Sequence, residues 1–67
     1  MLEIVINGKK SCLSDHSHLL DLVRERGIEN KRIAIEHNGS IVPRDAWKTT
    51  RLFEGDQLEI VVAVGGG

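Results

Sequence analysis

The residues of this chain whose types and position most clearly indicate a chemical role are the last three, Gly65-Gly66-Gly67. Glycine has no Cβ, so such a run can thread a narrow channel and adopt backbone angles that other residues avoid. The carboxylate of Gly67 would be unshielded, but it is a poor electrophile because its leaving group would be oxide. An acyl adenylate made with ATP would supply a good leaving group for attack by sulfur or an amine. We therefore predict that Gly67 reacts and that the catalytic machinery belongs to a partner.

Other reactive side chains form no recognisable catalytic or metal-binding set. His16 and His18 are two residues apart, but no third metal ligand can be identified, so we expect a loop that caps a helix. Cys12 could be a nucleophile or a persulfide carrier, although a lone strand cysteine is more often a small packed residue. His37 is expected to be exposed. No metal site, bound cofactor or enzymatic activity of the chain itself is predicted.

Length and composition exclude several classes of protein. The chain has 67 residues, enough for one domain, and nine Lys and Arg against ten Asp and Glu. This balance and an aromatic content of 3% argue against a nucleic-acid partner. The longest apolar run has five residues, far fewer than the roughly 20 of a membrane helix. No signal segment opens the chain, so a cytoplasmic location without membrane partners is predicted.

A strand and a hairpin must come first. Leu2, Ile4 and Ile6 share one face of a strand over residues 2–6, and Asn7-Gly8 favours a two-residue turn with positive φ at both positions. The return strand is then about 9–14. This register places Cys12 opposite Glu3 on the face away from the core.

One helix of about nine residues follows. One stripe of an amphipathic helix, at spacings i, i+3, i+4 and i+7, consists of Leu19, Leu22, Val23 and Arg26. Ser17 or His18 would cap its start, with Asp21 in the first turn. Gly27 and Ile28 predict a Schellman ending.

The second half of the chain predicts strands joined by short connections. Ile33 to Glu36 alternate as a strand, which Asn38-Gly39 turns toward a stub at Ile41-Val42. Pro43 suits the first position of a short helical turn. Trp47, on that turn, is expected to plug the edge of the sheet, because burial of its large apolar body is favourable.

The last strand decides the predicted fold. Glu54-Gly55-Asp56 reads as a solvated turn, and residues 58–64 are apolar on both faces near their end, which is typical of a central strand. The assembly that fits is α+β. It is a ubiquitin-like β-grasp, with a mixed four- to five-stranded sheet packed on one main helix and a short helical turn. Residues 1–64 would form the domain and 65–67 a flexible tail.

The surroundings of the tail suggest a docking surface. Val5 and Val61 should face outward on adjacent strands and, with Ala63 and Val64, offer apolar area to a partner. The segment 51–67 has one Arg and three acids, which gives a net charge of −2 before the terminal carboxylate. We expect an acidic collar that basic partner residues recognise. Its members are Glu54, Asp56 and Glu59.

Along nearly its whole length the chain resembles the thiamine-biosynthesis sulfur carrier proteins, which are ubiquitin-like β-grasp domains. The matching pieces are Asn7-Gly8, Asp21-Leu22-Val23, Asn38-Gly39, Ile41-Val42-Pro43-Arg44 with Trp47, Gly55-Asp56 and Val64-Gly65-Gly66-Gly67. The Val-Pro-Arg-x-x-Trp run combined with the Gly-Gly end is the specific part. The small subunit of molybdopterin synthase shares that end but is usually longer and lacks the run.

The resemblance implies a reaction cycle. An adenylyltransferase of the ubiquitin-activating type would use ATP and magnesium to adenylate Gly67. Sulfur derived from cysteine, delivered by a donor such as a cysteine desulfurase, would convert the adenylate to a thiocarboxylate. Thiazole synthase would take this sulfur into the thiazole ring of thiamine. Three alternatives stay open: a molybdopterin-type sulfur carrier, a ubiquitin-like protein modifier and a plain β-grasp interaction module.

Overall fold

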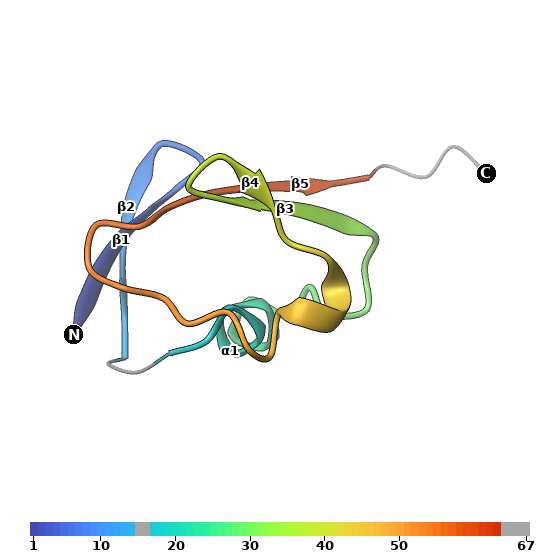
Figure 1. Cartoon of the computed structure of the whole chain (residues 1–67), viewed down its shortest axis with the longest axis horizontal. Helices are drawn as coiled ribbons and strands as arrows, with labels where there is room; N and C mark the ends of the chain where they lie inside the picture. Colours follow the sequence, from blue (N-terminus) through green and yellow to red (C-terminus); the bar gives the residue numbers. More distant parts are fainter. Residues whose placement is uncertain (15–16, 64–67) are drawn as a thin grey trace.

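A five-stranded mixed sheet curves over one α-helix (Figure 1). The structure is a computed structural model that describes residues 1–14 and 17–63. In chain order the elements are β1 (Leu2–Ile6), β2 (Lys9–Leu13), α1 (Leu19–Glu25), β3 (Ile33–His37), β4 (Ser40–Ile41), the 3-10 helix η1 (Arg44–Ala46) and β5 (Gln57–Val62). The strand order is β2-β1-β5-β3-β4, with β1 and β5 parallel and the other pairs antiparallel. The predicted central pairing of the first and last strands is confirmed.

The first hairpin has the predicted register. Ile6 lies opposite Lys9, and Glu3 opposite Cys12. Asn7 and Gly8 have φ values of 50° and 82°, as a two-residue turn that follows the strand twist requires. The return strand ends at residue 13, one residue earlier than predicted.

Helix α1 has seven residues, Leu19–Glu25, rather than nine. His18 is its N-cap residue with extended backbone angles, and its amide donates to the Asp21 carboxylate at 2.8 Å. The chain leaves the helix at Gly27, with φ 69°. There the amides of Gly27 and Ile28 donate to carbonyls of the last turn at 3.0 and 3.2 Å, so the predicted Schellman ending is confirmed. The N-cap at His18 and the Schellman ending at Gly27 therefore limit the helix to seven residues.

The apolar core lies between the sheet and α1. Its buried side chains are Ile4, Ile6, Leu13, Leu19, Leu22, Val23, Ile35, Trp47, Leu52 and Leu58. Three of the four predicted stripe residues of α1 are among them, whereas Arg26 is exposed. Trp47 is 1% exposed and donates its indole N–H to the Val42 carbonyl at 3.1 Å. It is therefore a core residue and not only an edge plug.

The connection around η1 differs from prediction by one position. Pro43 has ψ 154°, which is extended, so it precedes η1 instead of opening it. Strand β4 likewise begins at Ser40, because Asn38-Gly39 alone forms the turn.

Arg44 links η1 to the loop after α1. Its guanidinium donates to the carbonyls of Glu29 and Lys31 at 2.8 and 2.9 Å. The same group lies 4.4 Å from the ring centroid of Trp47. The Val-Pro-Arg-x-x-Trp run is thus a structural clamp between two connections.

The described residues contain no helix of the length and apolarity that crossing a membrane demands, since the α-helix has seven residues.

Candidate functional site

Strand β5 leads from the middle of the sheet toward the C-terminal end of the chain (Figure 1). It begins at Gln57, one residue earlier than predicted, and is described to Val62, followed by Ala63. Val64 and the three predicted tail glycines, Gly65, Gly66 and Gly67, lie outside the described residues. The assignments made to those four positions stay predictions.

Two turn asparagines fasten β5 through their side chains. The Asn7 amide group donates to the Ile60 carbonyl at 3.0 Å, and its oxygen accepts from the Ile60 amide at 2.7 Å. The Asn38 side-chain oxygen accepts from the Gln57 amide at 2.9 Å. Both asparagines have left-handed backbones, with φ 50° and 49°. The sequence marked them only as turn residues, although an asparagine, unlike aspartate, carries both the donor and the acceptor that Asn7 uses.

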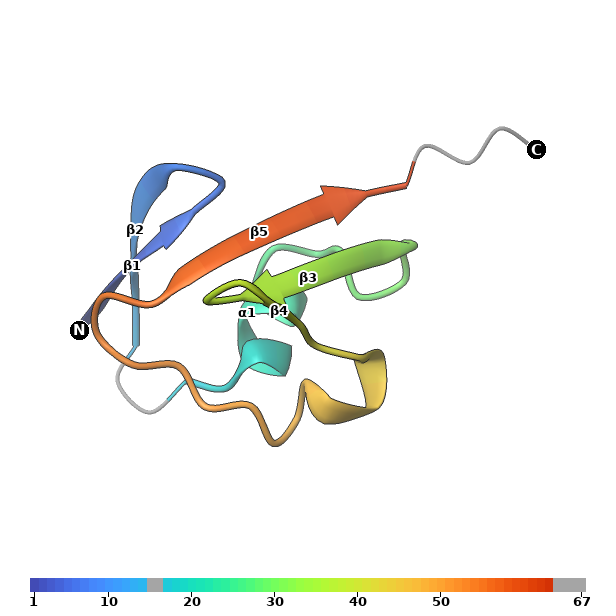
Figure 2. The same cartoon turned by 45° about the horizontal axis from the view of Figure 1, so that its top comes forward.

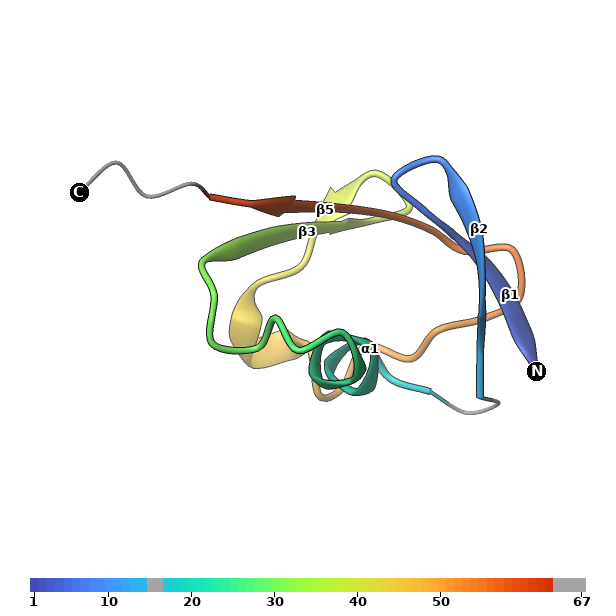
Figure 3. The ribbon, with the colours of Figure 1, turned by 180° about the vertical axis from the view of Figure 1, so that it is seen from behind.

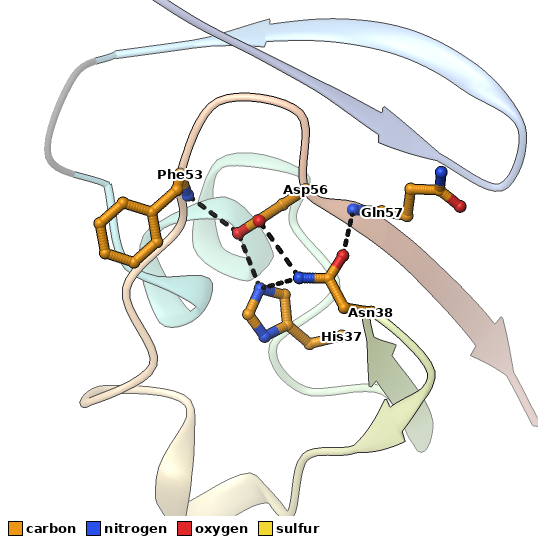
Figure 4. A network of polar contacts seen from close by, with 5 residues as sticks. All are labelled: His37, Asn38, Phe53, Asp56 and Gln57. Carbon is orange, nitrogen blue, oxygen red and sulfur yellow. Dashed lines mark hydrogen bonds and ion pairs between the residues drawn. The ribbon is translucent and has the colours of Figure 1, made fainter.

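A buried carboxylate holds the start of β5 (Figure 4). Asp56 is 8% exposed, and its Oδ2 accepts from the Phe53 amide at 2.9 Å and lies 2.7 Å from Nε2 of His37. Its Oδ1 accepts from Asn38 at 3.2 Å. An ionised carboxylate only accepts hydrogen bonds, so Nε2 of His37 carries the proton. Burial acts to raise the pKa of Asp56, but the bonds from His37, Phe53 and Asn38 outweigh it and lower this pKa below its ordinary value.

This network corrects three predictions. Asp56 is a buried anchor and not part of a solvated turn, and His37 is half-buried rather than exposed. Glu54 accepts the Glu3 amide at 2.9 Å beside the start of β5. Six strand residues, about 20 Å, separate that start from Ala63. The predicted acidic collar is wrong for Glu54 and Asp56, because both lie at the far end of β5.

The helices pack on one face of the sheet and do not cover the other, outer face (Figures 1 and 3). Val61 is 62% exposed on this face, opposite Ala34 of β3, and Ala63 is also exposed. Val5 is half-buried and pairs with Gln57, four residues before Val61. That spacing is about 13 Å along the strand. The structure therefore gathers Val61, Ala63 and Ala34 and leaves Val5 apart from them.

Two neighbours of this surface were missed from the sequence. Ile41 is 73% exposed and lies opposite Glu36. On its other side Glu36 lies opposite Glu59, so two carboxylates face each other across β3 and β5. Within residues 1–14 and 17–63, neither carboxylate has a hydrogen bond or an ion pair. Only the long-range register of β3 and β5 reveals this pair, and no local motif encodes it.

Comparison with known proteins shows the family to which this fold belongs. The ThiS family matches residues 4–67. The chain belongs to the ThiS family. It is 33% identical over 63 residues to the sulfur carrier protein ThiS of Bacillus subtilis (strain 168), covering 92% of this chain and 96% of that protein.

A solved structure confirms the fold. The crystal structure of the thiamine biosynthesis protein ThiS from Geobacter metallireducens matches with a TM-score of 0.83 and 25% identity. The match covers 98% of this chain and 100% of that chain. The ubiquitin-like β-grasp and the family of sulfur carriers in thiamine biosynthesis, both predicted from sequence, are confirmed.

Another relative is much longer. The thiazole synthase of Paramagnetospirillum magneticum (strain ATCC 700264 / AMB-1) is 35% identical over 66 residues, 98% of this chain. This ThiS-family chain spans only 20% of the length of that relative.

The remaining candidate groups of this ThiS-family chain are not gathered into a site. Cys12 is exposed on β2, which contradicts the expectation of a packed residue. His18 lies at the start of α1, and His16 is outside the described residues. The described part of the chain contains no group of three or more His, Cys, Asp or Glu placed to hold a metal.

Proposed function

We propose that this ThiS-family chain carries sulfur as a thiocarboxylate on Gly67. The observation that supports this most directly is the extent of the family match, which runs through residue 67 and so includes the three glycines. The proposal requires a free carboxylate on Gly67. In the first step a carboxylate oxygen attacks the α-phosphate of ATP and releases pyrophosphate. A partner persulfide then displaces AMP, and a thiol cleaves the resulting S–S bond to leave the thiocarboxylate.

The chain acts in this scheme as a carrier and co-substrate, and catalysis belongs to its partners. ATP and magnesium would be bound by an adenylyltransferase of the ubiquitin-activating type, and sulfur would come from a donor such as a cysteine desulfurase. The scheme places the protein in the cytoplasm, where ATP and cysteine are at hand. The chain itself would bind no cofactor.

Thiazole synthase is the acceptor that we propose. The Paramagnetospirillum relative bears that name, and a segment like this chain makes up about a fifth of it. A carrier-like segment within a single polypeptide of that name supports transfer of the sulfur to the same class of enzyme.

The partner would dock on the outer face beside the end of β5. Val61 and Ala63 provide exposed apolar area there, and Glu59 provides negative charge. Val64, the next residue in the sequence, stays a predicted partner contact outside the described residues. An interface with an apolar centre and a charged partner surface fits these groups, with the charge acting mainly on the association rate.

The test is the intact mass of the protein after incubation with ATP, magnesium, cysteine and host extract. The control is a chain that lacks Gly66 and Gly67. Exchange of one oxygen for one sulfur, located on Gly67 and absent in the control, is expected. A ladder of higher-mass conjugates would instead indicate a protein modifier. If the mass is unchanged in an extract that adds sulfur to a known carrier, the proposal is wrong and the chain acts instead as an interaction module.

A further inference from the structure

The last part of β5 has a strand on one side only. The amide of Ala63 donates to the Arg32 carbonyl at 2.8 Å, and the amide of Asn38 donates to the Gln57 carbonyl at 2.8 Å. These two bonds fix the phase of the antiparallel ladder, in which alternate residues bond to the same neighbour. Odd-numbered residues of β5 therefore bond toward β3, and even-numbered residues point their main-chain groups toward β1.

On the side of β5 that faces β1, Ile60 is the last residue whose main-chain groups have a described hydrogen-bond partner. The amide of Asn7 donates to the Leu58 carbonyl at 2.9 Å, and the Asn7 side chain then takes both main-chain groups of Ile60. The chain turns away at Asn7-Gly8. Among the described residues, the next even position, Val62, has no partner for its amide or carbonyl on this side. Figure 2 shows β3 along one side of this part of β5 and no strand along the other.

Exposed main-chain groups at a strand edge are a template for another strand. Val62 as a whole residue is 42% exposed, so this position is open to solvent. Resting on the proposed function, we infer that an extended, non-proline segment of the adenylating partner pairs with β5 at Val62. The segment would add to the sheet beside the Asn7 amide group.

Two features of the chain favour this occupant. Val62 lies five residues before Gly67, a span of at most about 18 Å, so a segment paired there would lie close to the reacting carboxylate. Outward-facing side chains of an added strand would lie beside Glu59 and Val61, whose carboxylate and exposed apolar surface are complementary to a segment with basic and apolar residues. Main-chain pairing would fix the register of the chain as it enters the active site of the partner.

A proline substitution tests the pairing directly. Val62→Pro removes an amide hydrogen that has no described partner, and proline is tolerated where the N–H of a strand faces solvent. Val62→Ala is the matched control for loss of the side chain. Val61→Pro is the control for geometry, because the amide of Val61 faces β3 and its loss should lower the melting temperature clearly.

The expected result is that Val62→Pro melts close to Val62→Ala but raises the KM for sulfur loading at least tenfold relative to it. Equal KM values for the two variants would overturn the inference while leaving the proposed function intact. If wild-type protein gains no sulfur, the proposed function fails and this inference fails with it.

Amide hydrogen exchange followed by NMR gives an answer that does not depend on a variant folding. In free wild-type protein the Val62 amide should exchange fast, whereas that of Val61 should be protected by β3. Addition of the activating enzyme with ATP and magnesium should slow exchange at Val62 at least tenfold. Slow exchange in the free monomer, or no change in the complex, would overturn the inference. Protection that appears on concentrating the carrier alone would also overturn it, because the occupant would then be a second copy.

Discussion

The substitution Asp56→Asn tests whether this carboxylate stabilises the start of β5 without taking part in the reaction proposed for Gly67. Asparagine keeps the shape of the side chain but removes the charge and replaces one acceptor oxygen with a donor. In the wild type, the two oxygens of Asp56 face three groups, from His37, Phe53 and Asn38, at 2.7–3.2 Å. In the variant at least one of these groups faces another donor.

The magnitude follows from this count. A hydrogen bond to a charged group contributes about 1.5–3 kcal/mol, so the loss of one bond and the weakening of the others should cost about 2–3 kcal/mol. A domain of 67 residues has a net stability of only about 3–5 kcal/mol. The variant should therefore be folded at low temperature and unfold with much less denaturant.

The effect should also depend on pH in one direction. The pKa of Asp56 is lowered in the folded state from its ordinary 3.8, so its contribution to stability is fully present above that value. The contribution is lost as the pH falls below 3.8 and through the folded-state pKa. The stability difference between wild type and Asp56→Asn should shrink over that range, because asparagine does not titrate.

Urea unfolding followed by fluorescence of the buried Trp47, from about pH 7 to about pH 2.5, measures both quantities. Asp45→Asn, an exposed aspartate on η1, is the matched control and should behave as wild type. A loss below about 0.5 kcal/mol at neutral pH, or a difference that stays constant down the acid range, would refute the assigned role of Asp56. Sulfur loading per folded molecule should not change, since Asp56 lies at the far end of β5.

Two further substitutions test other parts of the structure. Glu36→Gln removes the like charge opposite Glu59, so it should raise the free energy of unfolding by a few tenths of a kcal/mol and slow association with a basic partner. Denaturant unfolding and the salt dependence of the loading rate measure these effects, with Glu25→Gln on α1 as the control. If Glu36→Gln behaves like that control, the prediction is wrong. Arg44→Lys cannot keep both hydrogen bonds to the carbonyls and the contact with Trp47, so it should lower the free energy of unfolding by about 2 kcal/mol, measured by thermal unfolding. A melting temperature equal to that of the wild type would show that the contacts of Arg44 do not stabilise the fold.

Local rules predicted the parts of this fold that neighbouring residues decide. Asn7-Gly8 gave the register of the first hairpin, and Gly27 with Ile28 gave the end of α1. The burial of Asp56 and the facing carboxylates were not predictable in this way. They depend on which residue of β3 meets which residue of β5, about 25 positions later in the chain, and a one-residue slip would exchange the two faces.

The contacts of β5 explain why two facing acids, which have no ion-pair partner among the described residues, can persist on β3 and β5. Glu36 and Glu59 oppose folding slightly, but β5 is fixed on both sides of Glu59, before it by Asp56 and Asn38 and after it by Asn7, which binds Ile60. The hydrogen bonds that flank Glu59 can thus offset the weak repulsion between the two exposed carboxylates. Beyond Ile60 the side of β5 toward β1 has no further partner in the described chain, and the charged face and the open edge meet there. If the proposed cycle holds, a carrier that binds one enzyme after another benefits when the surface proposed for its partners is separate from the contacts that stabilise its fold.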